Sequence, residues 1–234
     1  MLVLSQRRRL PEIMDQPDLR PGRHLRALRG LARVNFWSGS AGILFRPLAD
    51  LARRLGRPIR ILDVASGGGD VPLRLWTKAR RAGLDFRIDG CDLSPLAVEH
   101  ARGRAEAAGA DVHFFVRDVL RGPSPPGYDA VTCSLFLHHL NDEQAVKYLQ
   151  WAAATAAYAV LVNDLERGGL GWALAHLAVR FLTTSDVVQV DGPRSVESAF
   201  TRTEALALAE RAGLRGATVK WRWPFRYLLK WERP

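Results

Sequence analysis

Short runs of branched apolar residues alternate along the chain with longer segments in which apolar residues recur every three or four positions. The short runs are typical of buried strands and the longer segments of amphipathic helices. Regular alternation of the two predicts an α/β fold whose parallel sheet is covered by helices. The predicted strands are residues 59–64, 86–91, 112–116, 128–134 and 158–162, followed by a terminal hairpin of 217–223 and 225–231.

The first 56 residues follow a different pattern. Pro11, Pro17 and Pro21 exclude a long helix before residue 21, so residues 1–20 are expected to be a poorly ordered lead-in. A helix is predicted from Pro21 to about residue 34, a break at 35–40, and a second helix at 43–55. We therefore expect an N-terminal helical extension, 1–56, and a main domain, 57–234.

Composition narrows the protein class only in part. The 234 residues are 47% apolar, enough for one hydrophobic core, and carry a net charge of +10. The charge is mostly arginine spread along the predicted helices, which makes nucleic acid an unlikely partner. Cys91 and Cys133 lie in apolar runs and are expected to be buried thiols; the sequence shows no metal-ligand set, so no metal is predicted. The apolar run at residues 1–4 is too short for a signal peptide, which predicts a cytoplasmic location.

A glycine-rich turn follows the first predicted strand. Gly67, Gly68 and Gly69 stand between that strand and a helix expected from Asp70, so the backbone can approach a ligand closely. The dinucleotide pattern G-x-G-x-x-G fails because its third glycine would fall on Pro72. No Gly-Lys-Ser or Gly-Lys-Thr follows either, which excludes a P-loop.

Asp63, Ala65, Gly67 and Gly69 form an acid followed by a small-x-Gly-x-Gly loop. This arrangement resembles the first motif of the class I S-adenosylmethionine-dependent methyltransferases, with Ala65 in place of the family's usual first glycine. Asp92 ends the second strand, a little over 20 residues after the glycines, where a carboxylate can accept hydrogen bonds from ribose hydroxyls. The alternative role for Asp92 is an ordinary helix cap.

The resemblance covers roughly residues 59–231 and implies a fold and a cofactor. The implied fold is a Rossmann-like seven-stranded, mostly parallel sheet with an antiparallel C-terminal strand, helices on both faces, an N-terminal helical lid and an inserted cap helix. The implied cofactor is S-adenosylmethionine. Its other implied contacts are with residues that follow the second, third and fourth strands: Leu93, Asp118, Val119 and Ser134.

His138 and His139 follow the fourth strand, at the edge where open α/β sheets bind ligands. A histidine with an ordinary pKa near 6.5 can accept a phenol proton, so one of the two is expected to act as the base. The sequence does not choose between them. Asp164 follows the fifth strand and either orients a histidine or the acceptor, or is a solvated loop acid.

Residues 166–200 are expected to be a cap insertion. Its apolar run, 168–182, is shorter than the roughly 20 residues that span a membrane. It predicts a cap helix with Trp172 and His176 pointing into an acceptor pocket; core packing and a transient membrane-surface contact are the alternatives. Residues 191–195 predict a turn with an accessible Arg194. Trp37 is expected either to close over the cofactor or to anchor its helix.

The Leu-Phe-Leu-His-His-Leu segment at 135–140 and the apolar cap resemble methyltransferases that act on small molecules. They favour O-methylation of a phenolic or polyketide-type aromatic acceptor, with or without a lipid tail. C-methylation of a quinol-type ring, as in ubiquinone and menaquinone biosynthesis, is the near alternative. An RNA methyltransferase and a non-catalytic cofactor-binding scaffold remain further alternatives. The former is disfavoured because no Asn/Asp-Pro-Pro-Tyr/Phe follows strand four.

Overall fold

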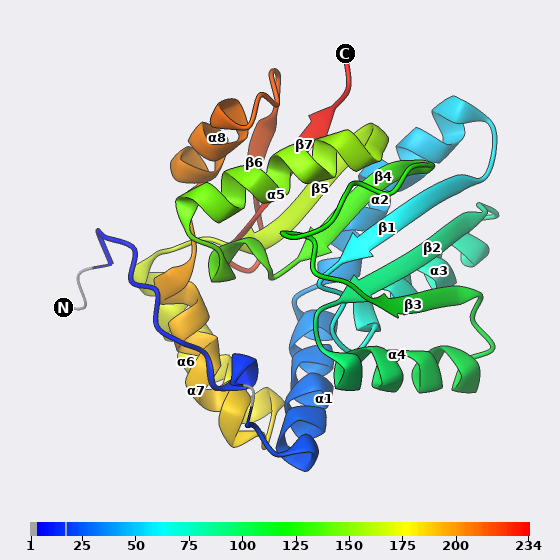
Figure 1. Cartoon of the computed structure of the whole chain (residues 1–234). Helices are drawn as coiled ribbons and strands as arrows, with labels where there is room; N and C mark the ends of the chain where they lie inside the picture. Colours follow the sequence, from blue (N-terminus) through cyan, green and yellow to red (C-terminus); the bar gives the residue numbers. More distant parts are fainter. Residues whose placement is uncertain (1–3, 17) are drawn as a thin grey trace.

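A computed structural model describes residues 4–16 and 18–234 (Figure 1). Its sheet has seven strands in the order β3-β2-β1-β4-β5-β7-β6. Strand β7 is antiparallel to both β5 and β6, whereas the other neighbouring pairs are parallel. The strands are β1 (Ile59–Val64), β2 (Phe86–Asp92), β3 (Val112–Val116), β4 (Tyr128–Ser134), β5 (Ala156–Leu165), β6 (Thr218–Arg222) and β7 (Arg226–Glu232). The predicted sheet, including its antiparallel C-terminal strand, is confirmed.

Helices separate the parallel strands, as the sequence pattern predicts. They are α1 (Pro21–Trp37), α2 (Ser40–Leu55), α3 (Asp70–Arg81), α4 (Pro95–Ala107), α5 (Asp142–Thr155), α6 (Gly169–Leu182), α7 (Asp186–Ser198) and α8 (Arg202–Arg211). Two short 3-10 helices, η1 (Ile13–Asp15) and η2 (Leu137–His139), complete the elements of the described residues.

The sheet has a hydrophobic core on each face. Leu62, Val131 and Val160 pack against α5 and α8 on one face. The neighbouring strand residues pack against α2, α3 and α4 on the other: Ile61, Ala130 and Leu161. Successive strand side chains point to opposite faces, so these near-continuous apolar strands fill both cores.

Hydrogen-bonding caps fix where several helices begin. The Ser94 hydroxyl accepts from the Ala97 N–H at the start of α4, and Pro95 occupies the first helical position. Thr201 and Glu204 form the predicted capping box of α8.

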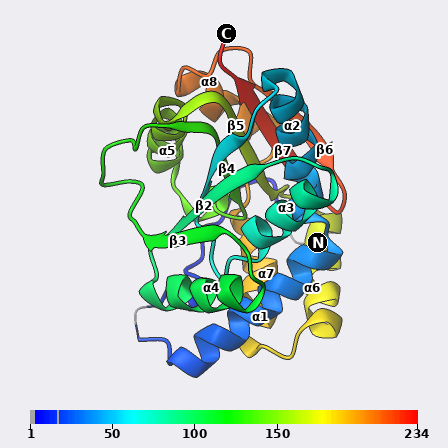
Figure 2. The same cartoon turned by 90° about the vertical axis from the view of Figure 1, so that its right-hand side faces the viewer.

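A third layer lies beyond the carboxyl ends of the parallel strands (Figures 1 and 2). It consists of α1, α6, α7 and the segment that precedes α1. Ala27, Val179, Val187 and Val188 form a small core between these helices. Helix α2 packs on the sheet instead. Among the described residues of the expected 1–56 extension, therefore, those before residue 38 cover the edge of the sheet and those of α2 do not.

Residues 4–16, which we name the N-terminal strap, are held in place and do not form the poorly ordered lead-in that the prolines suggested. The Arg8 N–H donates to the Glu197 carbonyl, and the Arg7 guanidinium to that of Ser198. The N–H groups of Ile13 and Met14 both donate to the Asp191 carboxylate. These partners lie more than 170 positions away in sequence, so no local pattern reveals them. Pro17 lies outside the described residues.

Three expected boundaries are wrong. Helix α1 continues to Trp37 and α2 begins at Ser40, so the break between the two helices is shorter than the expected 35–40. Strand β5 extends to Leu165, which places Asp164 within the strand. Residues 191–195 belong to α7 and form no turn. A Cβ on Gly192 would lie 2.8 Å from the Val179 side chain, so this glycine permits close packing of α7 on α6.

Candidate active site

A cavity of about 1120 Å³ lies between the sheet and the third layer. Its lining on the sheet side includes the glycine loop and the residues that follow β2 and β4. Its lining on the opposite side comes from the strap and from α1, α6 and α7. Ligands of open α/β sheets bind at this edge, beyond the carboxyl ends of the strands. The cavity therefore has the position of a ligand site.

Asp92 is held against the glycine loop. The Gly67 N–H donates to one carboxylate oxygen of Asp92 at 2.8 Å, and the Ser94 N–H donates to the other at 2.9 Å. Ala65 has a φ of 53°, a left-handed conformation that glycine adopts at lower cost. The backbone at Ala65, the first position of the small-x-Gly-x-Gly loop, is therefore better suited to glycine than to the alanine that this chain carries.

Gly69, expected to contact the cofactor, lies beneath the glycine loop. It does not line the cavity, whereas Gly67 and Gly68 do. A Cβ on Gly69 would lie 2.8 Å from the Phe114 ring, and its φ of 74° is also left-handed. This glycine is needed for packing beneath the loop. The Gly68 carbonyl, in turn, accepts a hydrogen bond from Arg104.

Two buried acids line the cavity near the loop. Asp63 accepts a hydrogen bond of 2.6 Å from the Thr132 hydroxyl, yet burial raises the pKa of Asp63 to about 7. Burial also raises the pKa of Asp70. The Oδ2 atom of Asp70 has no hydrogen-bond partner among the described residues. A cationic ligand group would lower the pKa of both acids, because it stabilises the charged form of a buried carboxylate. It would also give Asp70 Oδ2 a hydrogen-bond partner.

This donor and acceptor set fits S-adenosylmethionine, which carries an ammonium, a sulfonium and a ribose diol. Asp70 offers an acceptor without a partner to the ammonium, and Asp92 offers a fixed carboxylate to the diol. The other predicted cofactor residues, apart from Gly69, also line the cavity: Ala65, Leu93, Asp118, Val119 and Ser134. Asp118 accepts from the Leu120 N–H, which orients its side chain.

His138 lies on η2, directly after β4, and only 2% of it is exposed. Its Nδ1 lies 2.6 Å from Asp164 Oδ1, and its main-chain N–H donates to the other oxygen of Asp164. Asp164 is completely buried on β5. The interpretation of Asp164 as a solvated loop acid is therefore wrong, since it orients His138.

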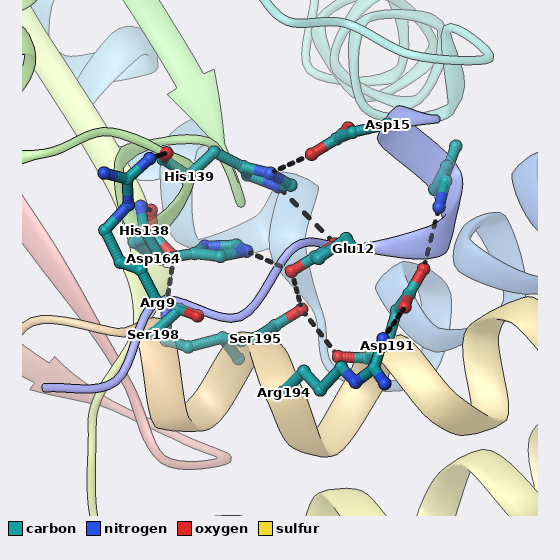
Figure 3. A network of polar contacts seen from close by, with 12 residues as sticks. Arg9, Glu12, Asp15, His138, His139, Asp164, Asp191, Arg194, Ser195 and Ser198 are labelled. Carbon is teal, nitrogen blue, oxygen red and sulfur yellow. Dashed lines mark hydrogen bonds and ion pairs between the residues drawn. The ribbon is translucent and has the colours of Figure 1, made fainter. Parts of the chain in front are cut away.

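The strap brings Glu12 to both histidines (Figure 3). Glu12 Oε1 lies 3.6 Å from Nε2 of His138, and Glu12 Oε2 lies 3.8 Å from Nε2 of His139. The Ser195 hydroxyl donates to Glu12 at 2.6 Å. Nδ1 of His139 lies 2.9 Å from Asp15. Glu12 was not predicted as a site residue, because nothing in the sequence near residue 12 marks it as one.

These carboxylates change the acid–base character of His138. Burial by itself lowers the pKa of His138, but the charges and hydrogen bonds of Asp164 and Glu12 outweigh burial and raise it. Burial opposes the charged form of Glu12, yet His138 and His139 lower its pKa. The carboxylates of Asp164 and Glu12 therefore favour the protonated form of His138.

Of the residues predicted to contact the acceptor, one lines the cavity and the others do not. Trp37 lines the cavity. Trp172 and His176 do not: their rings stack on each other at 5.2 Å, and the Trp172 indole N–H donates to Glu197. The face of α6 that lines the cavity instead carries Gly171, Leu174, Ala175, Ala178, Val179 and Leu182. A helix that is apolar on nearly every face gives no sequence signal for which side is buried.

Arg194 also lies outside the cavity lining. Its guanidinium donates to the Pro11 carbonyl, so it anchors the strap. Another polar residue of the lining, Arg226, carries no signal in the sequence. Arg226 is buried on β7 and donates to the Ser40 hydroxyl at 2.5 Å. An arginine that follows an apolar hairpin turn resembles a surface residue in the sequence.

The strand order, the glycine loop after β1 and the cavity beyond the strand ends define a class of protein. They are the features of a class I S-adenosylmethionine-dependent methyltransferase fold, which confirms the resemblance seen in the motifs.

Comparison with known proteins agrees with this fold. Residues 61–157 match the family model described as a methyltransferase domain. Demethylmenaquinone methyltransferase of Thermus thermophilus is 41% identical over 86 residues, which are 36% of this chain and 37% of that protein. Ubiquinone biosynthesis O-methyltransferase of Xanthomonas campestris is 29% identical over 135 residues, 56% of this chain and 54% of that protein.

Among solved structures, human N-acetylserotonin methyltransferase in complex with S-adenosylmethionine shares this fold. Its TM-score is 0.65 at 16% identity, over 92% of this chain and 56% of that one. The chain spans about one third to one half of the length of the two curated relatives named above, the Thermus and Xanthomonas methyltransferases. Among the described residues, no helix has the length and apolar character needed to cross a bilayer.

Proposed function

We propose that this protein transfers a methyl group from S-adenosylmethionine to an oxygen of a small aromatic acceptor. The observation that carries the proposal is that one cavity joins two kinds of site. Buried acids and a glycine loop lie at one end of it, and two histidines oriented by acids lie beside it. The first set suits a cationic, ribose-containing cofactor, and the second suits an acceptor that must lose a proton.

When bound, S-adenosylmethionine supplies a methyl group on a positively charged sulfur, which is a good leaving group. The chain's own residues then have to bind the cofactor, orient the acceptor and exclude water from both. Asp63, Asp70 and Asp92 would hold the cofactor's polar groups. The third layer covers the cavity and would exclude water, while η2 places the histidines beside the acceptor. Positioning of this kind contributes much of the rate of a two-reactant step.

The cavity favours an apolar acceptor. Besides the face of α6, its lining includes Leu28, Leu31 and Val188 from α1 and α7. Its volume of about 1120 Å³ slightly exceeds the roughly 300–1,000 Å³ found for single-ligand pockets, which suits a cofactor together with a second molecule. Leu170, Leu177 and Phe181 are exposed along one outer side of α6, where a membrane-bound, lipid-tailed acceptor would approach.

Proton removal is proposed to take place at the histidine pair. The carboxylates around His138 favour its protonated form, so we assign removal of the acceptor's proton to His139. His139 is 26% exposed at its side chain and lines the cavity. Asp15 holds its Nδ1, so Nε2, which faces Glu12 at 3.8 Å, is the nitrogen that would take the proton.

C-methylation of a quinol-type ring is the second candidate. The observation that favours it is the likeness to the Thermus demethylmenaquinone methyltransferase. Both reactions begin by ionising a ring hydroxyl, so the same histidine pair serves either one. The two differ in the atom that receives the methyl group.

The test begins with calorimetric titration of the protein with S-adenosylmethionine and, separately, with NADH. We expect binding of the first and none of the second. Methyl-labelled cofactor is then offered with phenols, aromatic polyketides and demethylated quinols, and the methylated atom is located by NMR. Methyl transfer to carbon alone would replace the O-methylation proposal, and absence of cofactor binding would refute both.

A further inference from the structure

We propose that Glu12, His138 and His139 form a binding site for a divalent metal ion of the zinc type. Each residue offers one ligand atom, and these atoms all lie within 4.8 Å of one another. Two imidazoles and one carboxylate are a common protein ligand set for Zn²⁺ in sites that keep a position open for another ligand. The proposed use of the ion in methyl transfer rests on the function proposed above, whereas ion binding itself does not.

The distances suit such an ion. In a tetrahedral site with bonds of about 2.1 Å, neighbouring ligand atoms lie about 3.4 Å apart. The two distances from the Glu12 oxygens to the histidine Nε2 atoms, 3.6 and 3.8 Å, exceed this by only a few tenths of an ångström. The two distances involve different oxygens of Glu12, so ion binding would require side-chain rotations that bring the three ligand atoms, now within 4.8 Å of one another, to the tetrahedral spacing.

Each of the three ligands has a partner on its far side. Nδ1 of His138 is held by Asp164, and Nδ1 of His139 by Asp15, so that Nε2 of each ring faces Glu12. The Ser195 hydroxyl holds the Glu12 carboxylate (Figure 3). Histidines that bind metals nearly always donate their other ring N–H to a carboxylate, carbonyl or water, which fixes the tautomer and ring orientation. Two carboxylate-held histidines that face a third acid reproduce this arrangement.

The charges around the cluster also favour a cation. The carboxylates of Glu12, Asp15 and Asp164 surround the two imidazoles. Arg7 and Arg9 are close by, but their guanidinium groups bind main-chain carbonyls of residues 138–140 and so hold η2 in place. A divalent ion with two neutral imidazoles would offset two of the three negative charges.

The cluster lies in the lining of the acceptor cavity, so the fourth position of the ion can be reached by a ligand there. An acceptor hydroxyl bound at that position would release its proton to solvent more readily. Its oxygen would then form the bond to the methyl carbon as the carbon–sulfur bond breaks and its electron pair passes to sulfur. In the ion-loaded protein the ion would thus replace His139 in ionising the acceptor.

The test measures zinc binding directly. Metal-free protein without a polyhistidine tag competes with a chromophoric indicator for Zn²⁺, and thermal unfolding is followed with and without the ion. We expect one zinc per chain and a higher melting temperature with zinc, because a ligand that binds only the folded state stabilises it. His113→Ala is the matched control, since His113 is an exposed histidine beside Asp111 and should bind zinc as the wild type does.

The ligand variants are Glu12→Gln and His139→Gln. Glu12→Gln preserves the side-chain length and an oxygen for Ser195, and we expect each variant to bind zinc more than roughly 100-fold more weakly. Asp164→Asn should weaken zinc binding by about 10- to 100-fold, as second-layer changes do. Failure of the wild type to bind zinc, or binding by a folded Glu12→Gln protein equal to that of the wild type, would overturn the proposal. If Glu12→Gln does not fold, His139→Gln decides in the same way.

Titration of the same preparations with S-adenosylmethionine separates the two proposals. Zinc binding without cofactor binding would refute the proposed function and leave the metal site intact. Cofactor binding without zinc binding would refute the metal site alone.

Discussion

Replacement of Asp92 by alanine tests the cofactor site most directly. Asp92 lies at the end of β2, where its carboxylate accepts hydrogen bonds from the N–H groups of Gly67 and Ser94. The same carboxylate is proposed to accept bonds from the cofactor's ribose. The variant therefore removes both an interaction within the protein and an interaction with the ligand, and the two effects can be estimated separately.

Loss of a hydrogen bond to a charged group costs about 1.5–3 kcal/mol. Two ribose bonds would then contribute about 3–6 kcal/mol, so Asp92→Ala should weaken S-adenosylmethionine binding by about 10²- to 10⁴-fold. The effect on folding should be smaller. Burial raises the pKa of Asp92, so its charge is already costly in the folded state. We expect a loss of about 1–3 kcal/mol in the free energy of unfolding, or roughly 2–10 °C in melting temperature.

The assay is calorimetric titration with S-adenosylmethionine at a temperature where thermal unfolding shows each variant to be folded. Asp89→Ala is the matched control. It lies three residues earlier on the same strand and accepts a hydrogen bond from the Tyr128 hydroxyl, away from the cavity lining. A folded Asp92→Ala protein that binds the cofactor within threefold of the wild type would refute the assignment of this carboxylate.

Three further changes test other parts of the structure. Ala65→Gly should raise the melting temperature by about 1–4 °C, since relief of the left-handed strain, about 1–2 kcal/mol, exceeds the entropic cost of glycine; a lower melting temperature would contradict this. Glu204→Gln should cost about 1–3 kcal/mol of unfolding free energy at pH 7 in denaturant titration, because it leaves the buried Arg167 without its charged partner; Glu210→Gln, on the exposed side of the same helix, should cost little. Burial raises the pKa of Glu204, but the ion pair with Arg167 outweighs burial and lowers it. The difference in free energy of unfolding between the wild type and Glu204→Gln should therefore be full above about pH 5. It should fade as the pH falls below the ordinary glutamate pKa of about 4.3. Leu174→Trp, which narrows the cavity, should raise the acceptor KM at least tenfold, whereas Leu177→Trp on the exposed side of α6 should not.

The fold was largely predictable because its strands carry strong local signals. The runs that became β3 and β4 are short and mostly apolar, and their predicted bounds agree with the structure. Caps such as Thr201 with Glu204 mark helix starts through neighbouring residues alone. The errors fall where tertiary contacts decide. Gly192 and Pro193 are typical turn residues, but packing on α6 keeps them inside α7.

The cofactor side of the site was predictable for a similar reason. The glycine loop and Asp92 lie at fixed distances from strand ends, and the parallel sheet brings strand ends together at one edge. Gly69 is the exception. Its sequence position suggests a cofactor contact, but its neighbour is the Phe114 ring on β3, a contact that only the packed structure can show.

The acceptor side could not be predicted in the same way, because its groups come from segments that no periodic pattern connects. Glu12 and Ser195 are 183 positions apart and share a hydrogen bond, and both reach the cavity only because the strap packs against α7. The sequence near residue 12 carries three prolines and few apolar residues, which locally favour disorder. Tertiary hydrogen bonds that the strap donates to Asp191 and accepts from Arg194 reverse that preference. Once the strap is fixed, the two histidines face three carboxylates, and their chemistry follows from that whole set of charges. A search of the sequence for closely spaced ligands or catalytic pairs therefore finds His138 and His139 but cannot find the acid that sets their charge.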